Sequence, residues 1–380
     1  MNRKAGIATF LAISLALLAA APLVNLRDDN VRTYARKLLA ERNYPRLQRL
    51  LFNADFLVAE FSALTWRTGL STSPAKVVVG QDGWLFLGDA YGDNVSQHRF
   101  GEQPGDPALA ARIATNLLAW QAWLRAQGVQ GFALVIGSDK HHIYREALPH
   151  WADLGRPPRV RSLLDGPARA LIADPAPALR QASAQGPVPT YYRSDTHWNL
   201  YGAALSLDAL RQTLAGQGVA LRWPTASPPA IERVGSRIGG DLGRFLYIQE
   251  RLEEPEPHPA VTNREAIDGS DIRVLETGER LEPGAFGQLQ FPRHTVRVVT
   301  PGALNPLKVL WLRDSFGIAQ SPLMAAAFRE TIQLHWGTGF ENGAQRLVEL
   351  VRQQRPDLVV LTVVERGLLS DVFLTPPPQD

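Results

Sequence analysis

Apolar strand-like runs alternate with amphipathic helical segments along most of this chain, and this alternation constrains its fold more than any other feature. The predicted strands cover residues 129–140, 188–198, 307–317, 331–337 and 356–366. The predicted helices cover residues 107–128, 199–218, 321–330 and 342–354. Strands that alternate with helices form a parallel sheet with helices on both faces. The sequence therefore predicts an α/β fold of this kind.

Three segments depart from the alternation. Residues 30–70 place Leu and Phe at three- and four-residue spacing among Arg and Glu, which predicts a helical lead-in. Residues 76–89 hold two short β-type runs around Asp82-Gly83, the turn chemistry of a tight hairpin. Between residues 227 and 301 Pro, Gly and acidic residues interrupt the pattern, which predicts a β-rich insert. The expected division of the chain is 1–28, 29–75 and a main domain over 76–380.

The N-terminus predicts export. Residues Ala5–Val24 form an apolar run of 20 residues, with Arg3 and Lys4 before it. A helix of this length spans roughly 30 Å, the thickness of the hydrocarbon core of a bilayer. The preceding cations favour a membrane anchor with its start in the cytoplasm and the rest of the chain in the periplasm. Small residues at Ala19–Ala21 leave a cleaved signal peptide open, and a buried core helix is the weakest interpretation.

Composition removes several classes of function. The chain of 380 residues has 40 Lys and Arg against 37 Asp and Glu, a net charge of +3, without a basic stripe. Nucleic acid is therefore not an expected partner. The absence of cysteine excludes disulfides, thiolate metal sites and a cysteine nucleophile. A nucleophile, if there is one, must come from another residue type.

Polar residues in three predicted loops point to acyl chemistry. Side chains just beyond the carboxyl ends of parallel strands meet in one crevice, and such loops occupy residues 137–142, 193–199 and 313–317. Ser315 follows a strand and precedes a helix, where free backbone N–H groups can hold an anion. A serine hydroxyl needs a base, and the base needs an orienting group. Asp195 and His197, two positions apart in a segment expected to be extended, supply both.

Each of these residues also has a structural interpretation. Asp314-Ser315 and Asp195-Thr196 are typical helix caps, and a lone histidine such as His197 is more often structural than catalytic. A metal site built from His141, His142, Asp195 and His197 is disfavoured because no helical HExxH spacing occurs. We therefore expect neither a metal nor a cofactor.

Several sequence blocks resemble a known family. The blocks are SDTHWNLYGA (194–203), LRDSFG (312–317), VVVGQDGWLFLG (77–88), GSDKHHIYREALP (137–149), GGDLG (239–243) and ERGL (365–368). Together and in this order they resemble the SGNH-hydrolase-like O-acetyltransferases of bacterial exopolysaccharides, the alginate group. The resemblance implies a flavodoxin-like, SGNH-type fold that is circularly permuted, so that the acid and base precede the serine. It also implies Ser315 as nucleophile, His197 as base and Asp195 as its orienting group in a catalytic domain over 76–380.

The implied activity is transfer of an acetyl group to a hydroxyl of an exported polysaccharide, such as alginate, through an acetyl-serine. The family logic also implies a membrane-bound O-acyltransferase as donor partner, with this chain on the inner membrane. A deacetylase with the same triad and a polysaccharide-binding scaffold remain open. The insert over residues 227–301, which includes residues 239–245, is expected to form a wall of the acceptor groove. The residues expected to contact the acceptor are Lys140, Tyr144, Arg313 and Trp198, although for Lys140 and Tyr144 a solvated position in the loop is equally compatible.

Overall fold

The computed structural model describes residues 3–379, without the side chains of residues 3–10, 13, 17 and 18. Contacts divide the chain into two compact units. The helical unit comprises the residues up to 72 together with 246–248, and the α/β unit comprises 73–245 and 249–380. The boundaries predicted for the domains stay a prediction.

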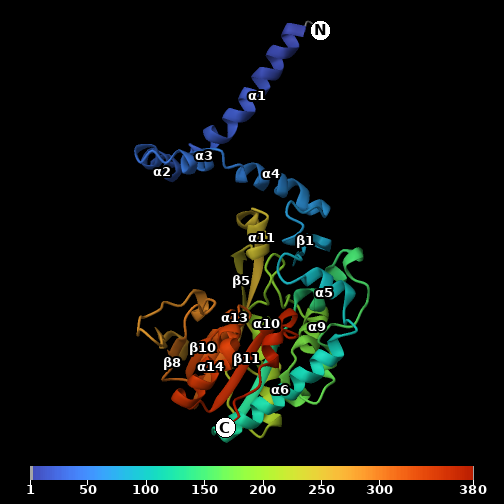
Figure 1. The fold of residues 1–380 in the computed structure, drawn as a ribbon, viewed down its shortest axis with the longest axis vertical. Helices are drawn as coiled ribbons and strands as arrows, with labels where there is room; N and C mark the ends of the chain where they lie inside the picture. Colours follow the sequence, from blue (N-terminus) through green and yellow to red (C-terminus); the bar gives the residue numbers. More distant parts are fainter. Residues whose placement is uncertain (1–2, 380) are drawn as a thin grey trace. The chain divides into compact units, whose positions relative to one another are not determined.

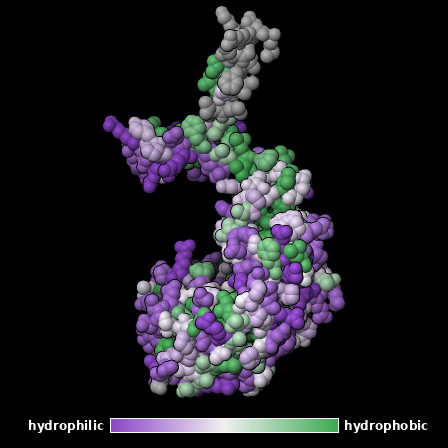
Figure 2. Space-filling model, turned by 45° about the vertical axis from the view of Figure 1, so that its right-hand side comes forward, coloured by the Kyte–Doolittle hydropathy of each residue, from purple (hydrophilic) through white to green (hydrophobic). Residues whose placement is uncertain are grey.

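The helical unit is built from three short helices after one long one (Figure 1). Its helices are α1 (Arg3–Asn25), α2 (Asp29–Ala40), α3 (Tyr44–Leu51) and α4 (Asp55–Thr65). Asp28 caps α2 by accepting hydrogen bonds from the backbone N–H groups of Asn30 and Val31. Apolar side chains on α4 stay on the surface, with Leu57, Phe61 and Leu64 more than half exposed. Figure 2 shows hydrophobic side chains gathered on this unit.

Within the described residues no helix is both long and apolar enough to cross a bilayer. Nine of the 20 residues of the anchor predicted over Ala5–Val24 have side chains outside that description.

A central sheet organises the α/β unit. The strand order among the described residues is β4-β3-β11-β9-β10-β8-β7. The strands from β4 to β10 run parallel to their neighbours, and β8 and β7 pair antiparallel at one edge. The bounds are β4 (Ile172–Ala173), β3 (Gly131–Gly137), β11 (Leu358–Val364), β9 (Asn305–Arg313), β10 (Phe328–Leu334), β8 (Val296–Val299) and β7 (Asp271–Val274). This mostly parallel sheet confirms the predicted α/β fold class.

Helices cover both faces of the sheet, as the continuous apolar strands require. Successive strand residues point to opposite faces, so Leu134 and Ile136 pack beneath α6 (Asp106–Ala126) and α14 (Trp336–Gln354). Ala133 and Val135 pack beneath α10 (Leu200–Gly216) and α13 (Gly317–Ala327) (Figure 1). The smaller helices of the unit are α5 (Asn94–Phe100), α7 (Lys140–Ile143), α8 (Arg161–Leu164), α9 (Ala176–Gln185), α11 (Asp241–Phe245) and α12 (Glu265–Asp268).

The predicted hairpin and insert are also present. The hairpin consists of β1 (Val77–Val79) and β2 (Leu85–Leu87), which pair antiparallel. The insert contributes a second antiparallel hairpin, β5 (Ile231–Ile238) with β6 (Glu253–Pro259), and the edge strands β7 and β8 of the central sheet. Part of the insert therefore extends the main sheet.

One predicted strand is wrong. Residues 188–198 form a loop whose only ladder contact in the described chain is an isolated bridge between Tyr191 and Trp198. The reason is local: the Asp195 carboxylate accepts a hydrogen bond from the backbone N–H of His197 at 3.1 Å, which bends the chain into a turn. An extended segment would keep that N–H for a neighbouring strand.

Candidate active site

Neighbouring strands bring the polar loops to one edge of the sheet. In register, Gly137 at the end of β3 lies beside Val364 of β11, and Thr362 of β11 lies beside Arg313 of β9. The loops that follow β3, β9 and β11 therefore leave the sheet side by side. This is the edge where α/β proteins place their sites.

Ser315 lies in the turn between β9 and α13. The turn is fixed by Asp314, whose carboxylate accepts hydrogen bonds from the N–H groups of Phe316 at 2.9 Å and Val364 at 2.7 Å. The indole of Trp336 donates a third bond to the same carboxylate at 3.1 Å. Asp314 thus ties the serine turn to the end of β11, and the helix-cap interpretation of Asp314-Ser315 does not apply because α13 has no side-chain cap.

His197 connects Ser315 to a carboxylate. Its Nε2 lies 2.8 Å from the Ser315 Oγ, and its Nδ1 lies 2.8 Å from Asp195 Oδ1. Because a carboxylate only accepts, Nδ1 carries the proton and Nε2 is free to accept from the serine hydroxyl. Asp195 does not cap the following helix, since Asn199 takes that place at α10. The structure therefore brings the three predicted residues together in the order that a serine nucleophile needs.

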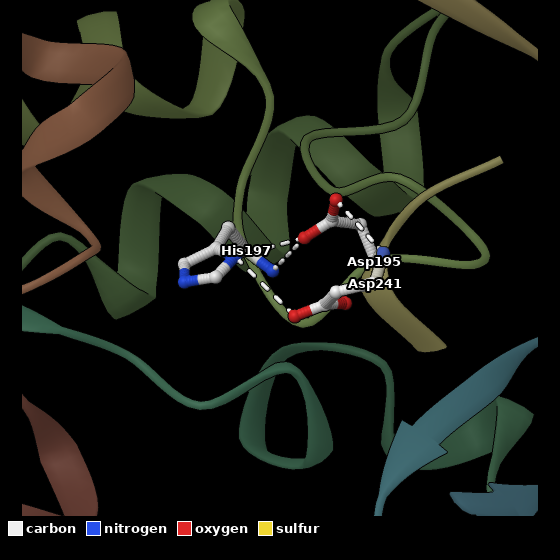
Figure 3. A group of neighbouring side chains, drawn as sticks. All are labelled: Asp195, His197 and Asp241. Carbon is white, nitrogen blue, oxygen red and sulfur yellow. Dashed lines mark hydrogen bonds and ion pairs between the residues drawn. The ribbon is translucent and has the colours of Figure 1, made fainter. Parts of the chain in front are cut away.

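A second carboxylate faces the same imidazole nitrogen. Asp241 Oδ2 lies 3.9 Å from His197 Nδ1, and Figure 3 shows both carboxylates on one side of the ring, with the other nitrogen pointing away from them. Asp241 itself is held by the backbone, because its Oδ1 accepts from the N–H of Thr196 at 2.7 Å. The ring is thus placed between two acids and the serine.

These contacts shift the acid and the base in opposite directions. Burial would raise the pKa of Asp195, but the hydrogen bond and charge of His197, with the Arg237 guanidinium 3.6 Å away, hold it well below its ordinary value. Burial would lower the pKa of His197, but the hydrogen bond and charge of Asp195 and the charge of Asp241 raise it above its ordinary value. The pair is therefore a carboxylate that stays ionised and a base of increased proton affinity.

The Ser315 hydroxyl and His197 border a pocket of about 290 Å³. Much of its lining comes from the insert: Arg237, Asp241, Arg244, Gln288 and Gln290. A second pocket of about 460 Å³ also includes Gln290 in its lining, together with Phe291, Arg293 and His294. The two pockets therefore share a wall residue within the insert.

Lys140 and Tyr144, two of the predicted contact residues, are not in the lining of this pocket. The expectation that Lys140 and Tyr144 lie on the rim is wrong, since their exposed fractions are 2% and 5%. The phenol oxygen of Tyr144 accepts from the N–H of Thr190 at 2.8 Å, and its ring stacks on Trp84. Lys140 is buried with its ammonium bonded to carbonyls of the loop that carries Asp195, and Tyr144 is buried with its ring against those of Trp84 and Tyr191.

Arg313 and Trp198 are also buried, and each donates at least one hydrogen bond to a backbone carbonyl. Arg313 is 1% exposed, and its guanidinium donates to the carbonyls of Leu289 and Gln290 of the insert. Burial lowers its pKa to about 9, opposed by the charge of Asp314. Trp198, also 1% exposed, borders the pocket and donates to the carbonyl of Phe316 at 3.0 Å. Both therefore brace the site from buried positions, and each borders a pocket: Trp198 the pocket beside Ser315, and Arg313 the second pocket.

The histidines of the 137–142 loop are separate from this cluster. His141 bonds the carbonyl of Leu87, and His142 pairs with Glu365. Within the described residues, the group whose ligand-type atoms lie close enough together to share a cation is Asp195, His197 and Asp241. The residues of the disfavoured metal site, His141, His142, Asp195 and His197, do not all converge on one point.

Sequence reasoning missed three acidic and basic residues around Asp195. The backbone N–H of Asp241 donates to the Asp195 carboxylate, and the Arg237 guanidinium lies 3.6 Å from it. Glu254 of β6 accepts from the N–H and hydroxyl of Ser194. The only signal in the sequence was the position of Asp241 inside the GGDLG block. The other two arrive through the hairpin of the insert, which no local pattern connects to residue 195.

Comparison with known proteins decides the family. A model of the family described as ALGX, the SGNH hydrolase-like domain of the acetyltransferase AlgX, matches residues 77–274, a little over half of the chain. The chain belongs to this family. The recognised resemblance is thus confirmed, and membership in an acetyltransferase family supports polysaccharide O-acetylation in the broad sense. No curated protein matches the chain significantly.

Solved structures of PatB1 and of a DHHW family protein share the fold at low identity. PatB1 of Bacillus cereus is 16% identical to this chain with a TM-score of 0.56, and the match covers 78% of this chain and 98% of PatB1. The structure of PatB1 with a sulfonyl adduct is 15% identical with a TM-score of 0.55, and the match covers 79% of this chain and 97% of that one. A DHHW family protein of Eubacterium siraeum is 13% identical with a TM-score of 0.51, over 82% and 98%. The O-acetyltransferase domain of Pseudomonas putida AlgJ is 18% identical with a TM-score of 0.44, over 77% and 92%.

Proposed function

We propose that this chain is a polysaccharide O-acetyltransferase with Ser315 as nucleophile, His197 as base and Asp195 as the carboxylate that orients it. The observation that carries the proposal is the position of His197, 2.8 Å from both the Ser315 hydroxyl and the Asp195 carboxylate. A hydroxyl is a weak nucleophile until an oriented base accepts its proton, and this contact provides that base.

The reaction has two balanced halves. In the first, the Ser315 Oγ attacks the carbonyl carbon of an acetyl donor while His197 Nε2 takes the hydroxyl proton. The bond from the acetyl carbon to the donor breaks, and the leaving group takes that proton back, which leaves acetyl-serine. In the second, an acceptor hydroxyl loses its proton to His197 and its oxygen attacks the acetyl carbon. The bond to Oγ then breaks, and Ser315 regains the proton.

The acceptor is a glycan hydroxyl placed by the insert. Arg244, Gln288 and Gln290 line the pocket beside Ser315, and they offer hydrogen-bond donors and acceptors that suit a sugar. A polymer is longer than a pocket of about 290 Å³, and the second pocket, which shares Gln290, gives it a continuation. An acceptor in line with the acetyl group also limits the access of water.

The acetyl donor would come from a membrane-bound O-acyltransferase, because acetyl carriers of the cytoplasm do not reach the periplasm. The cations Arg3 and Lys4 before the apolar run Ala5–Val24 support a location in the periplasm, held at the inner membrane. That position would bring Ser315 within reach of both the donor protein and the exported polymer.

The test uses the purified full chain, a chromogenic acetyl ester and oligosaccharides of several glycan types. We expect slow ester hydrolysis alone and acetylated oligosaccharide, detected by mass spectrometry, when an acceptor is present. A serine-reactive sulfonyl fluoride should label Ser315. Fast acetate release with no acetylated glycan would instead establish a deacetylase. Glycan binding without any turnover or labelling would establish a binding scaffold.

A further inference from the structure

The ammonium group of Lys140 is buried directly beneath the turn that carries Asp195. Its Nζ donates to the backbone carbonyls of Tyr192 at 3.0 Å, Arg193 at 3.0 Å and Asp195 at 2.6 Å. An ammonium has three N–H donors, and here all three are used on one short stretch of chain. The side chain is 2% exposed, so water does not compete for these bonds.

The three backbone carbonyls are the closest polar partners of the Lys140 ammonium, and the charged groups and aromatic rings around it lie farther away. Among the described residues it makes no ion pair within 4.0 Å, and the charges that act on it are those of Glu254, Asp195 and Asp241. Its Nζ also lies 5.6 Å and 5.4 Å from the ring centres of Trp84 and Phe86, a cation–π arrangement. Two further groups with a titratable or charged side chain border this region: Arg193, whose guanidinium lies over Trp84, and the neighbouring His141.

We propose that Lys140 is a positioning residue for the proposed acyl transfer: its ammonium gathers three carbonyls of the 192–195 turn so that the Asp195 carboxylate meets His197. This inference rests on the proposed roles of Asp195 and His197. Carbonyl oxygens that converge on one point repel one another, and a cation between them removes that repulsion. The middle of the turn is also held by other elements, because the N–H of Leu85 in β2 donates to the carbonyl of Arg193 at 2.9 Å and Glu254 of β6 accepts from Ser194. Among the hydrogen bonds of the described residues, the carbonyls of Tyr192 and Asp195 at its two ends are bound by Lys140, so the lysine supplies the restraint there.

A neutral, unbranched side chain one atom shorter removes the charge and all three donors. Lys140→Met would leave three buried carbonyls without this partner, and the turn would relax by a fraction of an ångström or more. A misplacement of about 1 Å in a catalytic group reduces a rate by roughly 10²-fold. We therefore expect Lys140→Met to lower kcat for a small acetyl ester by about 10- to 100-fold without raising KM.

The matched control is Lys76→Met, since the Lys76 side chain is exposed and lies outside the pocket. Rates are measured on protein whose circular dichroism matches the wild type. If Lys140→Met does not fold, Lys140→Gln is used, because its amide keeps two donors for the carbonyls; a smaller fall in kcat is then expected. An unchanged kcat in the folded variant overturns the inference, and so does a raised KM with unchanged kcat, which would make Lys140 a substrate contact.

Proton NMR adds a readout that a purely structural role would not move. The Nδ1 proton of His197 in its bond to Asp195 should give a downfield resonance in the wild type, shifted or lost in the Lys140 variant and unchanged in Lys76→Met. An unmoved resonance overturns the inference. Failure of the proposed function would look different from failure of the Lys140 inference. In that case a sulfonyl fluoride would not label Ser315 even in the wild-type protein.

Discussion

The Ser315 hydroxyl and the His197 imidazole are 118 positions apart in the chain, yet Oγ and Nε2 lie 2.8 Å from each other. The contact depends on two loops that are tied together behind it. The indole of Trp198 donates to the carbonyl of Phe316 at 3.0 Å, and its ring packs edge-on against that of Phe316. The residue after the base thus holds the residue after the serine, which keeps Nε2 and Oγ in register.

Replacement of the serine should remove activity and leave the fold. Ser315→Ala deletes one hydroxyl from a half-buried turn that Asp314 holds independently, so the free energy of unfolding should change by less than about 0.5 kcal/mol. Loss of the nucleophile costs on the order of 10⁶-fold in kcat in a serine protease. Acetyl transfer and sulfonyl labelling are the measurements, with Ser183→Ala as control. Retained acetyl transfer would refute the assignment of Ser315.

Asp195→Asn should prevent His197 from acting as a base, although a side chain of the same size still fills the position. An amide in place of the carboxylate can donate to Nδ1, which places the imidazole proton on Nε2 and leaves no acceptor for the Ser315 hydroxyl. The loss in kcat should be on the order of 10⁴-fold, as in the serine protease template. Turnover of a chromogenic acetyl ester measures it. A variant that kept more than about a tenth of the wild-type rate would reduce Asp195 to a structural turn residue.

The rate should rise with pH through a raised histidine pKa. Burial opposes the shift, but the hydrogen bond and charge of Asp195 and the charge of Asp241 hold the pKa of His197 above its ordinary value of 6.5. Only the neutral ring is a base, so kcat/KM increases as pH rises through that pKa. Asp241→Asn removes one negative charge and still accepts from the N–H of Thr196, so the acid limb should move to lower pH. Asp165→Asn, an exposed carboxylate outside the lining of the pocket, is the control. An unmoved acid limb in Asp241→Asn would contradict this role.

Long apolar runs made much of the fold predictable. The strands β3 and β11 are buried on both faces along their whole length, as is β9 from Val309 to Arg313, and all three have an apolar signal of their own. The 188–198 loop was misread as a strand because its aromatic residues imitate that signal, while its turn depends on the Asp195 side chain. The sequence alone could not show which face of the main domain the β-rich insert covers.

The candidate site was predictable only where its members are close in sequence or in known blocks. Asp195 and His197 are two positions apart, and Ser315 follows a strand end. The role of Lys140 was misjudged because a lysine in a polar loop is expected in water, and its burial depends on carbonyls some 50 positions away. Asp241 reaches His197 only through the fold of the insert. Long-range contacts of this kind leave no periodic signal in one sequence.

Phe291 should matter for long acceptors and not for small esters. Its side chain is 41% exposed, borders the second pocket and lies beside the ring of His335. Loss of roughly 40 Å² of ring contact with a sugar weakens binding by about 1 kcal/mol, a fivefold rise in KM. Phe291→Ala is compared with Trp151→Ala, an exposed aromatic outside both pockets. If the wild type and Phe291→Ala both had the same KM for short and for long oligosaccharides, the polymer would not bind at the second pocket.

Gly240 should be essential because the Asp195 carboxylate occupies the space of any side chain there. A Cβ at position 240 would lie 2.3 Å from both Cβ and Oδ2 of Asp195, far inside van der Waals contact. The carboxylate has little room to retreat, since Lys140 holds the Asp195 carbonyl and His197 holds Oδ1. Gly240→Ala should therefore displace the acid and lower kcat by about 10²-fold.

The comparison for this variant is Gly216→Ala, at the end of α10, where an added Cβ meets nothing within 4 Å. That substitution should leave kcat unchanged and stabilise the helix by up to about 1 kcal/mol. Ester turnover and thermal unfolding are measured for both variants. The double variant Gly240→Ala with Asp195→Asn should be no slower than Asp195→Asn alone, because both changes act on the same carboxylate. Multiplying losses in the double variant would show that Gly240 acts on some other part of the site.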